Sequence, residues 1–209
     1  MTNQFEALIA VLKRALPLKE LPRVGWIMEG ATLSEADSIG AHSYIVVLTS
    51  LLLTRQLEKS FGPFDREKVL TMATLHDLAE CITGDIDSGL KRRIAAKVNQ
   101  RGIIEQIEQE ALSALVADIS DSDSLLKTLR EFDEGKTKEA KLVKFADILE
   151  AFAFGHDRMG KVYDTYLSHA KDQLIAGSPS DDAGLGIHLA SLIDLAVLRW
   201  NDIAPKELD

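Results

Sequence analysis

The sequence predicts an all-α fold, and three observations lead to that prediction. Apolar residues recur at the three- and four-residue spacing of amphipathic helices along nearly the whole chain. No segment shows the alternation of apolar and polar residues, bounded by hairpin dipeptides, that is typical of strands. The 209 residues include only 13 glycines and 5 prolines, so few tight turns are expected. At this length we expect one domain, a compact multi-helix bundle formed by residues 1–209.

Helix boundaries in the first half of the chain follow from prolines, glycines and capping residues. Pro17 disfavours a helical residue before it, so the first helix should end there. Ser34 or Asp37 can cap the second helix, which a glycine-proline pair at 62–63 stops, and Asp65 can cap the third. These signals predict helices over residues 4–15, about 34–60 and 65–81, with an irregular segment at 22–32 and a loop at 83–85.

The second half of the chain has fewer breaks. The Asp and Ser residues of segment 118–124 predict a helix cap and connection, and the alternative, a calcium loop, lacks the required glycine and closing glutamate. Thr137 can open a long helix, and Gly155 is expected to stop it. Segment 177–186 is either a solvated connection or a lid over an active site. The predicted helices cover residues 90–116, 137–154, 160–175 and 187–203, with one more before 137 that begins near 125.

Composition and charge narrow the classes of partner. Acidic residues outnumber basic ones by 33 to 24, and a net charge of −9 repels a nucleic-acid polymer. The longest apolar stretch, about residues 45–53, is too short to cross a bilayer. A single cysteine, Cys81, allows no internal disulfide, and the N-terminal segment lacks the basic start of a secretory signal. We therefore expect a cytoplasmic protein that binds neither nucleic-acid polymers nor membranes.

Four polar residues lie on helix faces that should point into the core. Apolar residues stand three, four or seven positions away from each of them, which is the spacing of one helix face. His42, for example, shares its face with Val46. The four inward-pointing polar residues are His42, His76, Asp77 and Asp147.

Together these residues offer two imidazoles and two carboxylates from three predicted helices. An ionised carboxylate on a buried face costs several kcal/mol unless a counter-charge or a metal ion accompanies it. The donor set suits a divalent cation, and such a site leaves coordination positions open for water and substrate, which indicates catalysis. For any one histidine alone, the alternative is a hydrogen-bonded residue of the core.

The order of the four residues also resembles a known family. A single His, an adjacent His-Asp pair and then a distant Asp is the pattern of the HD superfamily of metal-dependent phosphohydrolases, which are all-α enzymes. The surrounding strings are similar to the 5'-deoxynucleotidase branch, which includes bacterial 5'-deoxyribonucleotidases and HD-domain-containing 2 proteins. HDLAECITGDI is the most specific string, because a bare His-Asp dipeptide is common. The similar strings are LPRVGWIMEG from Leu21, DSIGAHS from Asp37, MATLHDLAECITGDI from Met72 and EAKLVKFADILEA from Glu139.

The resemblance implies a metal centre and an assembly. It implies a metal-site core over about residues 21–155, C-terminal helices over about 160–203, and a homodimer. It also implies one divalent metal ion, which can be Co, Mn, Zn, Fe, Ni or Mg. The residues that match the family's metal ligands are His42, His76, Asp77 and Asp147.

The resemblance also implies catalytic and substrate-binding residues. Glu80 and Asp85 match acid-base and substrate-positioning residues, and Arg23 matches an arginine that contacts the phosphate. Independently of the resemblance, Glu80 lies four residues after His76, one helical turn along the same face. The alternatives are a surface glutamate that forms a salt bridge and, for Asp85, a cap of the next helix.

The chain departs from the family pattern at three places. Ala41 stands where the family usually has an acidic residue before the first histidine, so a partner of that histidine is expected to be missing. Ile148 stands where a lysine often follows the last aspartate. Some members have a tryptophan directly after the arginine, whereas here it is displaced to Trp26, which either binds substrate or belongs to the core.

The predicted function is a phosphomonoesterase that hydrolyses nucleoside 5'-monophosphates, with deoxyribonucleotides preferred by resemblance, to nucleoside and phosphate. One alternative is hydrolysis of another phosphate bond, in a cyclic dinucleotide, a dinucleoside polyphosphate or a triphosphate. Another is a non-catalytic module that binds a nucleotide. A second pair, His156-Asp157, is a rival metal site, and the basic run at 91–93 either attracts an anionic substrate or is a solvated helix start.

Overall fold

A computed structural model describes residues 2–87, 89–91, 103–160, 164–176 and 183–204. Over these residues the regular structure is helical, and the only strand-like pairing is an isolated β-bridge between Pro22 and Ser38. The all-α prediction is therefore confirmed. Every helix in these ranges is too short or too polar to span a lipid bilayer.

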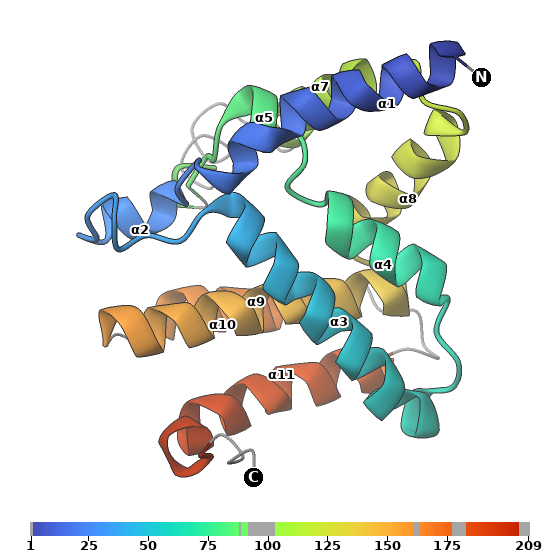
Figure 1. Ribbon diagram of the computed structural model, residues 1–209. Coiled ribbons are helices and arrows are strands. Elements are labelled where there is room, and N and C mark those ends of the chain that lie inside the picture. The colour runs from blue at the N-terminus through green and yellow to red at the C-terminus, as the bar shows by residue number, and fades with distance from the viewer. Residues whose placement is uncertain (1, 88, 92–102, 161–163, 177–182, 205–209) are drawn as a thin grey trace, which may run out of the picture.

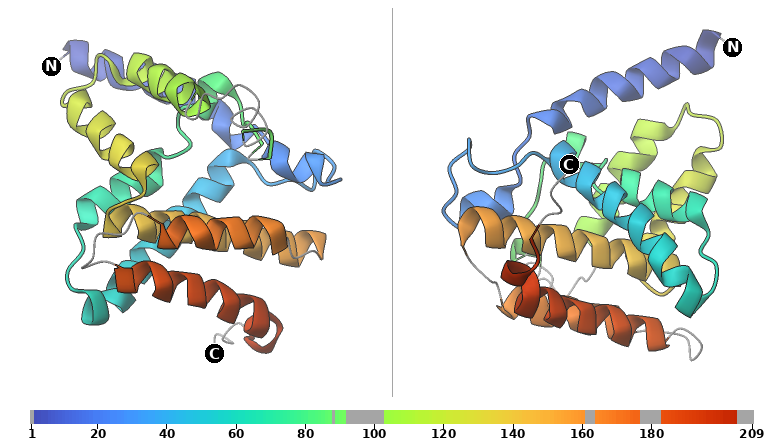
Figure 2. Two further views of the ribbon diagram at one scale, coloured as in Figure 1. Left: turned by 180° about the vertical axis from the view of Figure 1, so that it is seen from behind. Right: turned by 60° about the horizontal axis from the view of Figure 1, so that its bottom comes forward.

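The helices are arranged around α9, which contacts α3, α4, α8, α10 and α11 (Figure 1). Figure 2 shows α1 at one edge of the molecule and α11 at the opposite edge. The elements are α1 (Thr2–Ala15), the 3₁₀ turn η1 (Leu16–Lys19), α2 (Val24–Met28), α3 (Ile39–Phe61), α4 (Arg66–Leu75), α5 (Glu80–Thr83), α7 (Ile103–Val116), α8 (Ser122–Glu134), α9 (Lys138–Met159), α10 (Asp164–Ile175), α11 (Ala183–Arg199) and the 3₁₀ turn η2 (Trp200–Asp202).

The hydrophobic core lies where α3 and α4 pack against α9. Val46, Met72 and Val143 are fully buried there, and each such side chain contributes about 1.5–3 kcal/mol relative to an exposed one. Lys141 is also fully buried, and its Nζ donates to the carbonyl oxygen of Leu174 at 2.6 Å. This bond satisfies a carbonyl group at the end of α10 that the helix itself leaves unpaired.

Two of the predicted helix caps are confirmed and one is wrong. The side chains of Asp65 and Thr137 each accept a hydrogen bond from the backbone N–H three residues later, at 3.2 and 3.3 Å. Neither Ser34 nor Asp37 caps α3, because Ser38 does so by accepting from the N–H three residues later at 3.1 Å. Residues 32–36 instead form a separate turn, in which Glu35 Oε2 accepts a hydrogen bond from the backbone N–H of Thr32.

The third predicted helix ends six residues earlier than expected. α4 ends at Leu75 rather than Cys81, and the chain then makes a tighter turn. In this turn the N–H of Leu78 donates to the carbonyl oxygen of Leu75 at 3.0 Å, and the N–H of Glu80 donates to that of Asp77 at 3.1 Å. Bonds of this shorter span change the rotation per residue, so the helical spacing of polar residues does not continue through this segment.

The predicted stop at Gly155 is also wrong. α9 continues through this residue to Met159 and ends at Gly160, whose φ of 60° is the left-handed conformation that favours glycine. A glycine inside a helix costs about 1 kcal/mol relative to alanine. Gly155 is buried, and the packing of α9 against its neighbours outweighs that cost.

The remaining boundaries differ by a few residues. Segment 22–32 contains the short helix α2, and α8 begins at Ser122 rather than near residue 125. α7 covers the end of the predicted helix 90–116, while residues 92–102 lie outside the described part of the chain. α11 begins within segment 177–186, whose residues 177–182 also lie outside the described ranges.

Candidate metal and phosphate site

Two imidazoles face each other at the centre of the molecule. His42 comes from α3 and His76 from the turn after α4, and their Nε2 atoms lie 3.3 Å apart. His76 Nδ1 lies 3.0 Å from the carbonyl oxygen of Ala73, which can only accept, so Nδ1 carries the proton. The Nε2 atom of a neutral imidazole is then an acceptor, and it points at its counterpart. Either a proton on His42 Nε2 or a metal ion bound by both rings satisfies this arrangement.

Two aspartates complete this cluster. Asp147 Oδ1 from α9 lies 3.2 Å from His42 Nε2, and Asp77 Oδ2 lies 3.3 and 3.5 Å from the Nε2 atoms of His76 and His42. His42, His76 and Asp147 each offer one ligand atom, all within 4.8 Å of one another. The structure thus brings together the four side chains that the sequence singled out, from three separate elements.

The chemistry of this cluster favours a cation. Burial and the nearby Arg23 guanidinium oppose protonation of His42, but hydrogen bonds to Asp147 and Glu150 outweigh them and raise the pKa of His42 to about 9. Burial opposes ionisation of Asp147, yet the hydrogen bond from His42 lowers the pKa of this carboxyl to about 2. A divalent ion satisfies the same acceptors with more charge than a proton, so these residues could hold one.

His42 has an orienting partner that sequence analysis missed. Glu150 Oε2 lies 2.5 Å from His42 Nδ1, and the Glu150 side chain is buried. A carboxylate in this position fixes the tautomer and orientation of an imidazole. The missing partner expected from Ala41 is therefore supplied by α9, three residues after Asp147. The sequence does contain a signal for Glu150, because it follows Asp147 by three residues and so lies on the same helix face. Ile148 packs in the hydrophobic core.

Arg23 adds a guanidinium beside the cluster. It precedes α2, and its backbone N–H donates to the carbonyl oxygen of Asp37 at 3.0 Å. Its Nη1 lies 4.0 Å from Asp77 Oδ2. Burial opposes the charge of Arg23, but the carboxylates of Asp77 and Asp147 raise its pKa above the ordinary value. Nη1 is buried and has no hydrogen-bond partner within the described residues, so it can donate to an anion.

Asp85 holds the segment that carries Arg23. Its Oδ2 accepts a hydrogen bond of 2.5 Å from the N–H of Val24, the first residue of α2. A carboxylate at a helix N-terminus satisfies an otherwise unpaired donor. The alternative that Asp85 caps the following helical turn is wrong, because Asp87 does so by accepting from the N–H of Leu90 at 2.9 Å.

Glu80 is buried at the start of α5, only 8 % exposed. The alternative of a surface glutamate is therefore wrong. Burial and the negative charges of Asp77 and Asp85 raise the pKa of Glu80 to about 9. A carboxylate with a raised pKa is a stronger base once ionised, which suits it to proton transfer.

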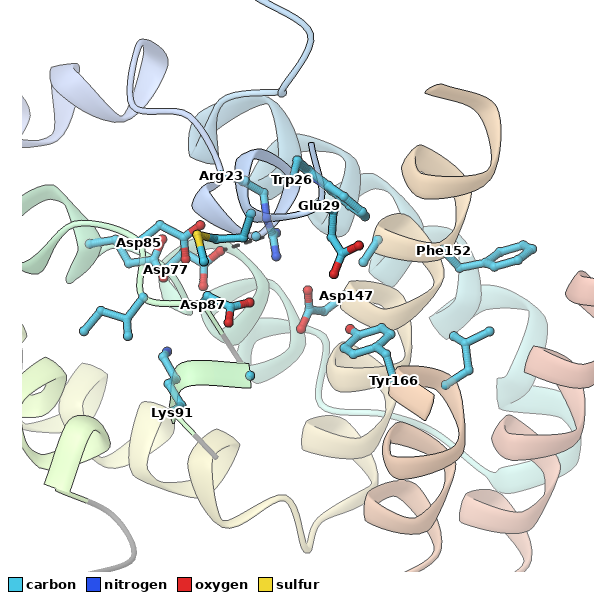
Figure 3. A pocket seen from close by; sticks show the side chains of 17 residues that line it. Arg23, Trp26, Glu29, Asp77, Asp85, Asp87, Lys91, Asp147, Phe152 and Tyr166 are labelled. Atoms are coloured by element: carbon cyan, nitrogen blue, oxygen red, sulfur yellow. Dashed lines mark ion pairs between the residues drawn. The ribbon is translucent and has the colours of Figure 1, made fainter. Parts of the chain in front are cut away.

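A cavity of about 540 Å³ lies beside the cluster and is lined by its two aspartates together with Arg23, Glu80 and Asp85 (Figure 3). Its volume lies within the usual range for small-molecule sites. Trp26 lines this cavity and also packs on Phe154 with ring centroids 5.0 Å apart, and its role in substrate binding stays a prediction. Trp26, Ala151, Phe152, Tyr166 and Leu167 form an aromatic and apolar wall, and the charged lining residues are Arg23, Glu29, Asp77, Glu80, Asp85, Asp87, Lys91 and Asp147.

The second His-Asp pair has different surroundings. Asp157 Oδ1 lies 3.2 Å from His156 Nδ1 and accepts a hydrogen bond of 2.7 Å from Trp200 Nε1. Among the described residues, every group of three or more side chains placed to bind a metal ion includes His42, and none includes this pair. The rival assignment to His156 and Asp157 therefore finds no support in the geometry.

Comparison with known proteins gives the family. The sequence model of the HD domain matches residues 16–178, which include Arg23, the four-residue cluster, Glu80 and Asp85. The chain belongs to the HD domain family. It is 30 % identical over 172 residues to the 5'-deoxynucleotidase HDDC2 of Xenopus laevis, and the match covers 79 % of each chain. We therefore describe the protein as an HD phosphohydrolase related to 5'-deoxynucleotidases.

Solved structures with the same fold include two from other organisms. The PH0347 protein of Pyrococcus horikoshii superposes with a TM-score of 0.67 at 28 % identity, over 90 % of this chain and 99 % of that one. A predicted metal-dependent phosphohydrolase of Magnetospirillum magnetotacticum superposes with a TM-score of 0.61 over 97 % of each chain. At 18 % identity the latter comparison supports the fold alone.

Proposed function

We propose that the protein is a metal-dependent phosphomonoesterase that converts nucleoside 5'-monophosphates, with 2'-deoxyribonucleotides preferred, to nucleoside and phosphate. One observation carries this proposal. The unpaired donor of Arg23, the buried carboxyl of Glu80 and the two aspartates line one cavity, and aromatic side chains form its other wall. A phosphate needs the charged side of such a cavity, and a nucleoside needs the aromatic side. A nucleotide needs both sides next to each other.

The His and Asp cluster serves as the cation site in this proposal, with His42, His76, Asp77 and Asp147 as ligands of one divalent ion. When bound, such an ion polarises a phosphate ester and acidifies water. Arg23 binds and orients the phosphate, because a guanidinium presents paired N–H donors to an oxyanion. Asp85 keeps Arg23 in place through its bond to α2.

Glu80 acts on the proton of the attacking water. Its carboxylate takes this proton as general base in the ionised form, which a cation held by the neighbouring Asp77 would favour. The ester bond between phosphorus and the 5'-oxygen then breaks, and that oxygen receives the proton that Glu80 took from water, so the nucleoside leaves as an alcohol and Glu80 is ionised again. Asp85 is the second candidate for handling a proton, as the resemblance implies.

Trp26 and Tyr166 bind the nucleoside. Aromatic faces stack on any base, so we expect little dependence on base identity. The preference for 2'-deoxyribose rests on the curated relatives, which are named 5'-deoxynucleotidases. By the family resemblance, we also propose a homodimer.

A screen of phosphate release tests the proposal. Deoxy- and ribonucleoside monophosphates, triphosphates and cyclic nucleotides are each assayed with Mn²⁺, Co²⁺, Mg²⁺, Zn²⁺, Fe²⁺ and Ni²⁺. We expect phosphate from monophosphates, and a higher kcat/KM for the 2'-deoxy forms. Equal values for the two sugars remove the deoxy preference and keep the phosphatase. If the protein hydrolyses only a cyclic dinucleotide, a dinucleoside polyphosphate or a triphosphate, the alternative of another phosphate bond is correct. If it binds nucleotides without turnover, the alternative of a non-catalytic module is correct.

A further inference from the structure

The cavity holds a second cationic side chain that the reaction described above does not use. Lys91 lines the cavity, and in Figure 3 it enters from a different side than Arg23. Lys91 lies in the helical turn after Asp87, whereas Arg23 lies before α2. The two cations are thus presented by separate segments of the chain.

Most of the charged side chains that line the cavity are acidic, so a second cation there matters for the binding of an anion. Even with a divalent ion held by Asp77 and Asp147, the carboxylates that line the cavity carry more charge than that ion and one guanidinium offset, so an entering anion benefits from a further cation. Among the described lining residues the cations are Arg23 and Lys91, and Arg23 already faces Asp77 at 4.0 Å. The acidic lining residues are Glu29, Asp77, Glu80, Asp85, Asp87 and Asp147.

The ammonium of Lys91 is held in position. Its Nζ donates to Glu108 Oε1 at 2.7 Å, which ties the turn to α7. An ammonium has three N–H donors, so this one bond leaves donors for a ligand. Burial disfavours its charge, but Glu108, Glu80 and Asp77 raise the pKa of Lys91 above its ordinary value. The side chain is 28 % exposed, so it is anchored and still accessible from the cavity.

We propose that Lys91 is a second phosphate-binding residue, which donates to a phosphoryl oxygen of the substrate while Arg23 binds the same group from another segment. Glu108 is its positioning residue, which keeps the lysine side chain extended along the cavity wall. The assignment rests on the proposed phosphohydrolase function for the identity of the anion. It goes beyond that function because the family resemblance implies no role for Lys91.

A matched pair elsewhere in the chain supplies the control. Lys68 donates to Glu131 Oε2 at 2.7 Å in an ion pair like that of Lys91 and Glu108, but neither residue of this pair lines the cavity. Lys91→Gln and Lys68→Gln each remove one such pair. Both variants are therefore expected to shift the melting temperature by a similar, small amount.

The test measures binding of inorganic phosphate and kinetics on the same preparations. Phosphate is titrated calorimetrically into the full chain with Mn²⁺ present, and kcat and KM are measured on a 2'-deoxynucleoside monophosphate. Lys91→Gln should weaken phosphate binding by about tenfold to a hundredfold, the usual effect of losing a hydrogen bond to a charged group. Lys91→Arg should restore most of the affinity, Glu108→Gln should cost a few-fold, and Lys68→Gln should change nothing.

The outcomes separate the two proposals. An unchanged phosphate affinity in Lys91→Gln overturns the assignment of Lys91, as does a wild-type protein that binds no phosphate. Loss of affinity in Lys68→Gln to the same degree also overturns it, because the effect is then one of stability. A wild-type protein that binds phosphate through Lys91 but releases none from any nucleotide overturns the proposed function and leaves the binding assignment intact.

Discussion

The chain contains two His-Asp pairs whose surroundings are opposite. His76 Nε2 faces the Nε2 of His42 at 3.3 Å, and Asp77 lies within 3.5 Å of both imidazoles with its side chain 20 % exposed. The side chain of Asp157 is 60 % exposed, and its neighbours are His156 and Trp200.

The chemistry of a His-Asp dipeptide is therefore decided by its surroundings and not by the two residues alone. The first pair lies where α3 and α9 supply another imidazole and another carboxylate, so unpaired acceptors converge. At the second pair, the indole of Trp200 and the neighbouring imidazole already satisfy the carboxylate, and the contact ties η2 to α9. Convergent acceptors need a cation, whereas satisfied ones do not.

The largest effect is expected for the first pair. His76→Ala removes one of four ligands and leaves buried carboxylates without compensation. We expect metal content near background and a loss of phosphate release greater than the roughly 10–100-fold that loss of an outer partner costs. Metal analysis of purified variants measures it. His156→Ala is the matched control, and metal loss in the control but not in His76→Ala would exchange the roles of the two pairs.

The second effect concerns Glu80. Its carboxyl lies beside the cluster and is not needed to complete the four-ligand set, so Glu80→Ala should keep the metal ion and still bind nucleotide. Removal of a general base costs about 10² to 10⁴ in rate, and the loss should appear in kcat with little change in affinity. Metal content, nucleotide affinity and kcat are measured on one preparation. A variant without metal makes Glu80 a ligand, and normal turnover assigns the proton to Asp85 or bulk water.

The third effect concerns the partner of His42. Glu150→Ala should weaken metal affinity by about 10–100-fold, because His42 loses the carboxylate that orients it. Glu139 is a matched control on the same helix, with 8 % exposure against 7 % for Glu150, and it accepts from the N–H of Asp65 at 3.0 Å instead. Glu139→Ala should lower stability without changing metal affinity. Equal metal affinities in the two variants would show that Glu150 has no orienting role.

The smallest effect is expected at the second pair. Asp157→Ala removes the acceptor of Trp200 Nε1 at an exposed position, so unfolding free energy should fall by about 1 kcal/mol or less. Trp200 and His156 lower the pKa of Asp157, so this contribution is present near neutral pH and lost as the pH falls into the acid range. Melting temperatures of wild type and variant should therefore converge in acid. A difference that grows in acid would contradict the bond's role.

The sequence was most informative where local rules decide the structure. Capping at Asp65 and Thr137 was predictable, because a side-chain oxygen and an N–H three residues later suffice. The continuation of α9 through Gly155 was not, because packing on neighbouring helices outweighs the local penalty. The turn after Leu75 was missed for another reason, because the spacing of apolar residues does not show where hydrogen bonds change from four-residue to three-residue span.

The residues of the site also differ in how far the local sequence identifies them. His42, His76 and Asp147 were recognisable as polar residues on apolar faces. Glu150 was missed because its importance depends on His42, which is 108 residues away in the chain and reaches it only through the packing of α3 on α9. The extent of the domain and the homodimer stay predictions.

The most direct measurement is phosphate release from 2'-deoxyadenosine 5'-monophosphate by metal-free protein before and after addition of a divalent cation, for wild type, Asp77→Ala and Asp157→Ala. We expect no release without the cation in any sample, and restored release in wild type and Asp157→Ala but not in Asp77→Ala. Release by the metal-free wild type, or full restoration in Asp77→Ala, would contradict a catalytic cation held by the first His-Asp pair.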